Sequence, residues 1–270
     1  ASAARSKSLR AAVTATVRSA ALFEAQLDAV LESDVDLVAA AVGVPPAVIA
    51  RGIRMRGPWG PVYGPVDLDI EDGGLTVLVC PAGSGRTALL MTLAGRMAPV
   101  SGELTVFGRR RPREIFAHAA LAGIDDLDSV SESVTVCDAI TEQLRWDASW
   151  YRLVPRARPT DLEAVCAPVF GDLPLPPLHE YVEELTELDR LLLRIALANT
   201  ARPELLVVGN LDYVTSDVNR VLLVERLIEL GRSQTVVTAT VNGIAHPGVR
   251  AQLAVSNTAR ADLAATQKGR

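Results

Sequence analysis

The segment 80–102 constrains the fold of this chain more than any other part of its sequence. An apolar run over 75–79 leads into a loop of small residues, and a helix-forming run follows from Thr87. A strand, a glycine loop and a helix in this order form a phosphate cradle. Glycines let backbone N–H groups close around the anion, and the first helical turn adds its positive dipole end. The same residues also fit a plain strand-to-helix turn that binds nothing.

The loop departs from the P-loop pattern at its two most demanding positions. That pattern has Gly first, Gly-Lys near its end, and then Ser or Thr for magnesium. Here Cys80 stands at the first position and Arg86 at the lysine, whereas Gly85 and Thr87 fit. Of the 27 basic residues only Lys7 and Lys268 are lysine, so an arginine in the loop follows the general composition of the chain.

The segments around the loop resemble the ATP-binding cassette (ABC) family, the nucleotide-binding subunits of ABC transporters. Leu93-Ala94-Gly95 matches the end of the P-loop helix, Ser101-Gly102-Glu103 the start of the next strand, and Pro203–Val208 a later strand. The resemblance covers about residues 53–245. It implies an α/β fold: a P-loop (RecA-like) mainly parallel core sheet, with an antiparallel β subdomain and an α-helical subdomain.

The resemblance implies a nucleotide site whose residues are Trp59, Gly83, Ser84, Gly85, Arg86 and Thr87. Trp59 has the spacing of the aromatic that stacks on adenine in the family, and Tyr63 is the alternative. Both aromatics also fit a simple cover over one end of the β subdomain. ATP is therefore a possible ligand. Thr87 is the only expected metal ligand, so we expect magnesium to be weakly bound or absent.

The positions at which the family hydrolyses ATP carry other residue types, so no catalytic residue is predicted. Gly209-Asn210 replaces Asp-Glu, Leu185-Thr186-Glu187-Leu188-Asp189 replaces Leu-Ser-Gly-Gly-Gln, Val241-Asn242 replaces His-Asp, and Asp125-Asp126 takes the place of a glutamine. Asp212 lies two residues beyond Asn210, but successive side chains leaving a strand point in different directions. We therefore do not expect Asp212 to replace a lost carboxylate.

These losses predict an ABC-type subunit that is hydrolysis-deficient, a pseudo-ATPase. It would be a structural or regulatory partner of a membrane-embedded subunit or of another ABC-type subunit, in a homodimer or heterodimer. A slow active ATPase that energises transport is the first alternative. A soluble regulator that binds DNA or protein through N-terminal helices is the second, although a net charge of −5 makes nucleic acid an unfavourable partner.

The chain divides into three expected parts. Residues 1–52 form an N-terminal helical extension, because apolar residues recur at helical spacing. Residues 53–250 form the ABC-type domain, with a helical subdomain at about 134–190, and 251–270 form a polar, partly helical tail. The chain has no run of 18 apolar residues, so we expect a cytoplasmic protein, peripheral on the cytoplasmic face of a membrane.

Three local features complete the expectations. Thr160-Asp161 is expected to cap a helix that ends at about Val169. The arginines at 109–113 are expected to form a solvated turn, with an acidic partner surface as the alternative. The three cysteines have neither paired nor metal-binding spacing, so we expect each of them to be buried and structural.

Overall fold

A computed structural model describes residues 46–58, 60–80, 83–124 and 133–255, and for Ser84 and Asn210 it describes only the backbone. The compact unit that contains these residues begins at Pro46. Most of the predicted N-terminal extension, and the loop at Asp125-Asp126, therefore lie outside the described residues. In the described part, no helix is long and apolar enough to cross a membrane.

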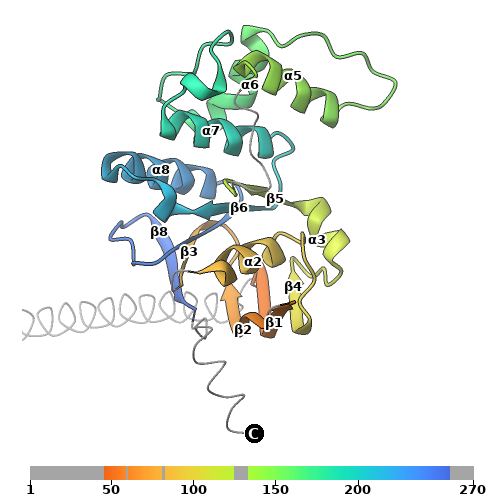
Figure 1. Ribbon diagram of the computed structural model, residues 1–270, viewed down its shortest axis with the longest axis vertical. Helices are drawn as coiled ribbons and strands as arrows, with labels where there is room; N and C mark the ends of the chain where they lie inside the picture. Colours follow the sequence, from red (N-terminus) through yellow and green to blue (C-terminus); the bar gives the residue numbers. More distant parts are fainter. Residues whose placement is uncertain (1–45, 59, 81–82, 125–132, 256–270) are drawn as a thin grey trace, which may run out of the picture. The chain divides into compact units, whose positions relative to one another are not determined.

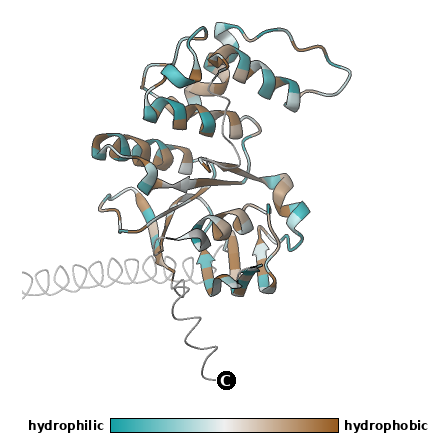
Figure 2. Ribbon diagram, in the orientation of Figure 1, coloured by the Kyte–Doolittle hydropathy of each residue, from teal (hydrophilic) through white to brown (hydrophobic). Residues whose placement is uncertain are grey.

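The centre of the unit is a five-stranded parallel sheet (Figure 1). Its order is β5 (Ala119–Ala122), β6 (Leu205–Asn210), β7 (Thr235–Thr240), β3 (Gly74–Val79) and β8 (Val249–Ala254). The inner strands are nearly continuous apolar runs, because helices or a second sheet cover both faces of a parallel sheet. Figure 2 shows this apolar character along the central strands.

Alternate residues of the central strands enter two separate cores. Leu75 and Val77 belong to one apolar cluster, while Leu78 and Cys80 belong to the other. The first cluster includes residues of α5 (Val136–Asp147), α6 (Pro159–Phe170), α7 (Glu187–Ala198) and α8 (Asp217–Gly231). The second includes residues of α2 (Ser84–Leu93), α3 (Pro112–His118) and a smaller sheet. The period-2 geometry of a strand thus joins the helical subdomain and the β subdomain through one sheet.

The smaller sheet is antiparallel, with the order β2 (Gly60–Ile70), β1 (Val48–Gly57) and β4 (Ser101–Val106). Its apolar face packs on α2. The Tyr63 hydroxyl donates a hydrogen bond of 2.8 Å to Thr92 Oγ1 on that helix. Tyr63 is 1% exposed, and its burial raises the pKa of the phenol despite this bond. The predicted fold class, a parallel core with an antiparallel β subdomain and a helical subdomain, is confirmed.

The structure corrects two predicted boundaries. β1 begins at Val48, so residues 48–52 belong to the β subdomain and not to a helical extension. Residues 251–254 of the predicted tail form the end of β8, which pairs with β3 at the edge of the sheet. Residues along β8 alternate between half-buried and exposed. An edge strand of this kind has few of the apolar residues by which a buried strand is predicted.

Two local expectations also change. Arg158, and not Thr160, precedes the first residue of α6, and Asp161 accepts a hydrogen bond of 2.8 Å from the Arg158 N–H. Arg109 forms two hydrogen bonds of 3.0 and 2.9 Å with Glu204, so it is part of the fold and not of a solvated turn. Arg110, Arg111 and Arg113 are exposed, as expected for a solvated segment.

The cysteine expectation is confirmed, because all three thiols are free and buried. Burial raises the pKa of Cys166 to about 12, so this thiol stays protonated at neutral pH and behaves as a small apolar side chain.

Candidate functional site

The phosphate loop places an open helix N-terminus at the end of β3. Gly83 precedes α2 with φ 148° and ψ 167°, a conformation in which only glycine is unstrained. Among the described residues no side chain caps this N-terminus, and the first turn has no acidic residue. A Cβ added at Gly83 would meet no atom within 4 Å. The backbone N–H groups of the first turn therefore remain suited to an anion.

Arg86, at the lysine position of the P-loop pattern, forms an ion pair with Asp212. Its Nη1 lies 2.7 Å from Asp212 Oδ2, and its side chain is only 7% exposed. The guanidinium is thus held inside the protein by a carboxylate that follows β6. Arginine suits such a buried pair, because its planar donors are weakly hydrated and never lose their charge.

Asp212 joins three parts of the site. Besides Arg86, its carboxylate accepts hydrogen bonds of 2.8 Å from Thr240 Oγ1 and of 2.8 Å from the Val241 N–H. Burial alone would raise the pKa of Asp212. The bonds from Thr240, Val241 and Arg86 outweigh that effect, and the pKa lies below its ordinary value. Asp212 is therefore ionised at neutral pH, and its carboxylate links α2 to the end of β7.

Cys80, directly after β3, stands at the position that is glycine in the P-loop pattern. It is 1% exposed and belongs to the core on the α2 side of the sheet. Burial raises the pKa of its thiol to about 11, and the positive charge of Arg86 offsets only part of this rise. A neutral buried thiol neither attracts a phosphate nor acts as a nucleophile, so Cys80 has a packing role.

Gly209, at the position of the family's metal-binding aspartate, has no room for a side chain. A Cβ added there would collide with the carbonyl oxygen of Gly123 and would lie 2.6 Å from the carbonyl carbon. The Gly209 carbonyl in turn accepts a buried hydrogen bond of 2.9 Å from Thr238 Oγ1. The register between β6 and β7 shifts between Val207 and Asn210, which is the signature of a bulge. The close approach of two glycine backbones thus replaces a carboxylate.

Both glycines line a cavity of about 350 Å³ between the carboxyl ends of β5 and β6 and the start of α7. Its described lining includes Arg190, Arg194 and Glu187. In the part of the chain that the structure describes, no group of three His, Cys, Asp or Glu side chains is arranged to hold a metal.

The N-terminus of α7, where the family has its signature glycines, is capped by the chain's own side chains. Thr186 Oγ1 accepts a hydrogen bond of 3.1 Å from the Asp189 N–H and donates one of 2.7 Å to the Asp189 carboxylate. Glu187 accepts hydrogen bonds from the N–H and the hydroxyl of Thr215, at distances of 3.1–3.2 Å. These acids and caps occupy the place in which an external phosphate would need free backbone donors.

The predicted nucleotide-binding residues are only partly brought together. Gly83, Gly85, Arg86 and Thr87 lie at the start of α2, where Arg86 is turned into its ion pair and Thr87 is half-buried. Trp59 lies outside the described residues, as does the side chain of Ser84. The alternative prediction, that Tyr63 stacks on adenine, is wrong because the Tyr63 ring is buried and its hydroxyl is hydrogen-bonded to Thr92.

Sequence reasoning missed the role of Asp212. It tested this residue only as a substitute for a lost carboxylate, whereas the structure uses it as the partner of Arg86. An available signal was the simultaneous presence of an arginine for the loop lysine and a new acid just after β6. The residues present fit the phosphates of a nucleotide at α2, whereas the described residues include no group of three His, Cys, Asp or Glu that could hold a metal ion.

Comparison with known proteins places this chain among transporter subunits. No family model matches it. It is 30% identical over 149 residues to the cytochrome c biogenesis ATP-binding export protein CcmA of Pseudomonas putida strain KT2440, a match that covers 53% of this chain and 67% of that protein. It is 45% identical over 60 residues to the sn-glycerol-3-phosphate import ATP-binding protein UgpC of Chromohalobacter salexigens, over 22% of this chain and 16% of that protein.

Solved structures have the same fold. A putative ABC transporter ATP-binding protein from Pyrococcus furiosus superposes with a TM-score of 0.60 at 16% identity, covering 77% of this chain and 96% of that one. CbiO1 from Clostridium perfringens, part of the ABC transporter complex CbiONQ, superposes with a TM-score of 0.58 at 15% identity, covering 78% and 85%. Together with the match to CcmA, these likenesses place the chain in one family: it belongs to the ABC transporter ATP-binding proteins.

Proposed function

We propose that this chain is a hydrolysis-deficient ABC-type subunit. It acts as a structural or regulatory partner of a membrane-embedded subunit or of another ABC-type subunit. The observation that carries the proposal is the ion pair between Arg86 and Asp212, at 2.7 Å, in which the only P-loop cation is neutralised by the protein itself. A loop cation that is occupied in this way contributes little to the charge stabilisation that phosphoryl transfer requires.

The backbone packing at Gly209 supports the same proposal. Gly209 packs directly on the backbone of Gly123, so the metal-binding aspartate cannot be accommodated without moving β5 or β6. Thr87 is then the single remaining candidate for the metal. Removing one preorganised charge-stabilising group commonly lowers the rate by about 10²- to 10³-fold. Here the metal ligand, the water-orienting carboxylate and the signature glycines are all replaced, so we infer that turnover is lost.

A nucleotide can still contact the start of α2. The residues that we propose for the phosphate contact are Gly83, Ser84, Gly85, Arg86 and Thr87. We propose that Trp59 stacks on the adenine ring. The relatives CcmA and UgpC are named as ATP-binding proteins, which favours ATP as the nucleotide. To use its guanidinium for phosphate, Arg86 must leave Asp212. We therefore infer weak binding that does not depend on magnesium.

The partner follows from the family. CcmA is named as an export protein and UgpC as an import protein, and CbiO1 is part of a transporter complex. We infer that this chain likewise assembles with a membrane component, at the cytoplasmic face. The closed N-terminus of α7 means that, in a dimer, this chain would not complete the nucleotide site of its partner subunit.

A nucleotide titration with matched variants tests the proposal. Labelled ATP is titrated against the full chain with and without magnesium, and phosphate release is followed in the same samples. We expect equal affinity with and without the metal, and no release above that of Thr87→Ala. Asp212→Asn weakens the hold on Arg86 and is expected to raise ATP affinity, by about tenfold if one charge-assisted bond of about 1.5 kcal/mol is relieved.

Asp217→Asn is the control, because it removes one carboxylate at the exposed start of α8, where the Asp217 side chain is 91% exposed. It should leave ATP affinity unchanged. Steady phosphate release that disappears in Thr87→Ala would instead establish the slow ATPase. Equal affinities of Asp212→Asn and the native chain would remove the ion pair as the cause of weak binding.

A further inference from the structure

The connection between α5 and α6 has the most exposed aromatic and apolar side chains of the described chain. We call residues 148–158 the aromatic loop, and Figure 1 shows it as an extended green segment at the edge of the helical subdomain. Trp150 and Leu153 are each 96% exposed, and Tyr151 is 75% exposed. Trp146, in the last turn of α5, is 78% exposed. Such large apolar groups rarely gather in water without a binding role.

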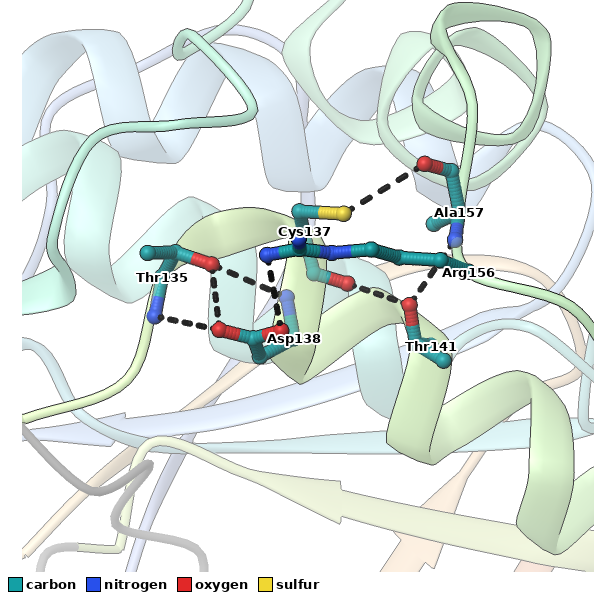
Figure 3. Close-up of polar contacts among 6 residues, drawn as sticks. All are labelled: Thr135, Cys137, Asp138, Thr141, Arg156 and Ala157. Atoms are coloured by element: carbon teal, nitrogen blue, oxygen red, sulfur yellow. Dashed lines mark hydrogen bonds and ion pairs between the residues drawn. The ribbon is translucent and has the colours of Figure 1, made fainter.

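The base of this loop is fixed to α5, as Figure 3 shows. The Ala157 N–H donates a hydrogen bond of 2.9 Å to Thr141 Oγ1, and the Ala157 carbonyl accepts one of 3.3 Å from Cys137 Sγ. Arg156 forms an ion pair of 3.2 Å with Asp138. Because Ala157 is buried, the C-terminal end of the loop is anchored.

The tip of the loop has its own internal order. The Arg152 N–H donates a hydrogen bond of 2.8 Å to the Ser149 carbonyl, which closes a turn. The rings of Trp150 and Tyr151 pack edge to face, with centroids 5.9 Å apart. The exposed side chains are therefore carried on a turn above a fixed base, and less conformational entropy is lost when they are covered.

The only charged residue at the tip of the loop, 148–155, is Arg152. Arg145, Arg152, Arg156 and Arg158 are all exposed, but Arg156 and Arg158 pair with Asp138 and Asp161, and Asp147 is exposed beside Trp146. Trp and Tyr with interleaved Arg is the composition of segments that lie at a membrane interface. There the rings sit at headgroup level and the guanidinium groups face anionic phosphates.

We propose that the aromatic loop binds the surface of an anionic lipid bilayer. Trp150, Tyr151 and Leu153 enter the interface, and Arg152 remains among the headgroups. The composition of the tip favours a membrane over an acidic protein groove, because its one charge, on Arg152, accompanies three large apolar side chains on an exposed turn that suits shallow insertion into a broad surface. This contact goes beyond the proposed function, since it requires neither a nucleotide nor a membrane-embedded partner.

Sedimentation of the full chain with vesicles tests the proposal. Vesicles of phosphatidylcholine alone are compared with vesicles that also contain phosphatidylglycerol. We expect binding to the anionic vesicles, weakened by salt, together with a blue shift of tryptophan fluorescence. The triple variant Trp150→Ala, Tyr151→Ala, Leu153→Ala should bind at least about tenfold more weakly, because its insertion is lost.

The control variant Tyr181→Ala, Val218→Ala, Val221→Ala removes three other exposed side chains of large apolar residues and should bind as the native chain does. Arg152→Glu should weaken binding to anionic vesicles while leaving thermal unfolding unchanged. The proposal is overturned if the native chain does not bind anionic vesicles, or if the loop triple variant and the control triple variant bind equally. Failure to bind vesicles would assign the loop to a protein contact and would leave the proposed ATP test unaffected.

Discussion

The N-termini of α2 and α7 are the two helix ends that an ABC subunit directs at phosphate, and here they differ. At α2, Gly83 leaves the first turn open, with no side-chain cap among the described residues. At α7, Thr186 caps the helix, and Glu187 and Asp189 add negative charge to its first turn. A helix dipole favours anions at its N-terminus, whether they come from a ligand or from the chain itself. The anion at α7 is internal, whereas α2 has kept room for an external one.

The difference teaches that the two sites have changed in different ways. At α2 the backbone geometry of a phosphate loop persists, and its cation has acquired an internal partner. At α7 a backbone N–H of the first turn, that of Asp189, already donates its hydrogen bond to the Thr186 side chain and so stabilises the helix itself. We infer that a subunit with one open and one closed end holds a nucleotide weakly and does not complete a two-subunit catalytic site.

The largest expected effect comes from an attempt to restore a side chain at the end of β6. Gly209→Ala places a Cβ against the Gly123 carbonyl, so β5 or β6 must move. We expect the free energy of unfolding to fall by about 3 kcal/mol, the upper range for overpacked sites. Urea unfolding followed by circular dichroism measures the change.

Gly57→Ala is the matched control, because a Cβ at Gly57 would meet a methyl group of Val62 at 3.3 Å and the Gly60 carbonyl oxygen at 4.0 Å. Its effect should be well below that of Gly209→Ala. Equal effects of the two variants would mean that the packing at position 209 tolerates a Cβ, so that the glycine there is a matter of residue type and not of packing.

Much of this comparison could be predicted from the sequence, since the glycine loop and the strand periodicity determine where β3, α2, β6 and β7 begin and end. What could not be predicted is the pairing of side chains across the fold. Arg86 and Asp212 are 126 residues apart, and their contact depends on the turn after β6. The Gly123 and Gly209 contact likewise depends on a backbone approach that no local pattern encodes.

The predicted boundaries at residues 52 and 251 were wrong for a different reason. β8 is an edge strand with alternating exposure, so its composition resembles that of a polar tail. Val48 to Gly52 continue the apolar, Ala-rich composition of the preceding segment, and only pairing with β2 and β4 makes them a strand. Tertiary pairing, and not local propensity, determines the structure at both ends.

A smaller effect is expected at the closed end. Thr186→Ala removes the side-chain cap of α7 and should lower the free energy of unfolding by about 1 kcal/mol. Ser216→Ala removes the corresponding cap of α8, where Ser216 Oγ accepts a hydrogen bond of 3.3 Å from the Asn219 N–H, and provides a matched comparison. Thermal or urea unfolding measures both variants. A neutral Thr186→Ala together with new binding of phosphate at α7 would show that this end is closed only weakly.

The smallest expected effect concerns pH at the open end. The pKa of Asp212 is lower in the folded chain than its ordinary value near 3.8, because hydrogen bonds outweigh burial. The unfolded chain therefore takes up this proton at higher pH than the folded chain does. The stability from Asp212 is fully present above the unfolded pKa and is lost as pH falls through the folded value. Since the side chain is 27% exposed, we expect the change to stay below about 1 kcal/mol.

Unfolding of the native chain, Asp212→Asn and the control Asp217→Asn is compared from neutral pH to about pH 3. The stability difference between the native chain and Asp212→Asn should shrink as the pH falls below about 4, whereas a constant difference would mean that the stability contributed by Asp212 does not depend on its ionisation.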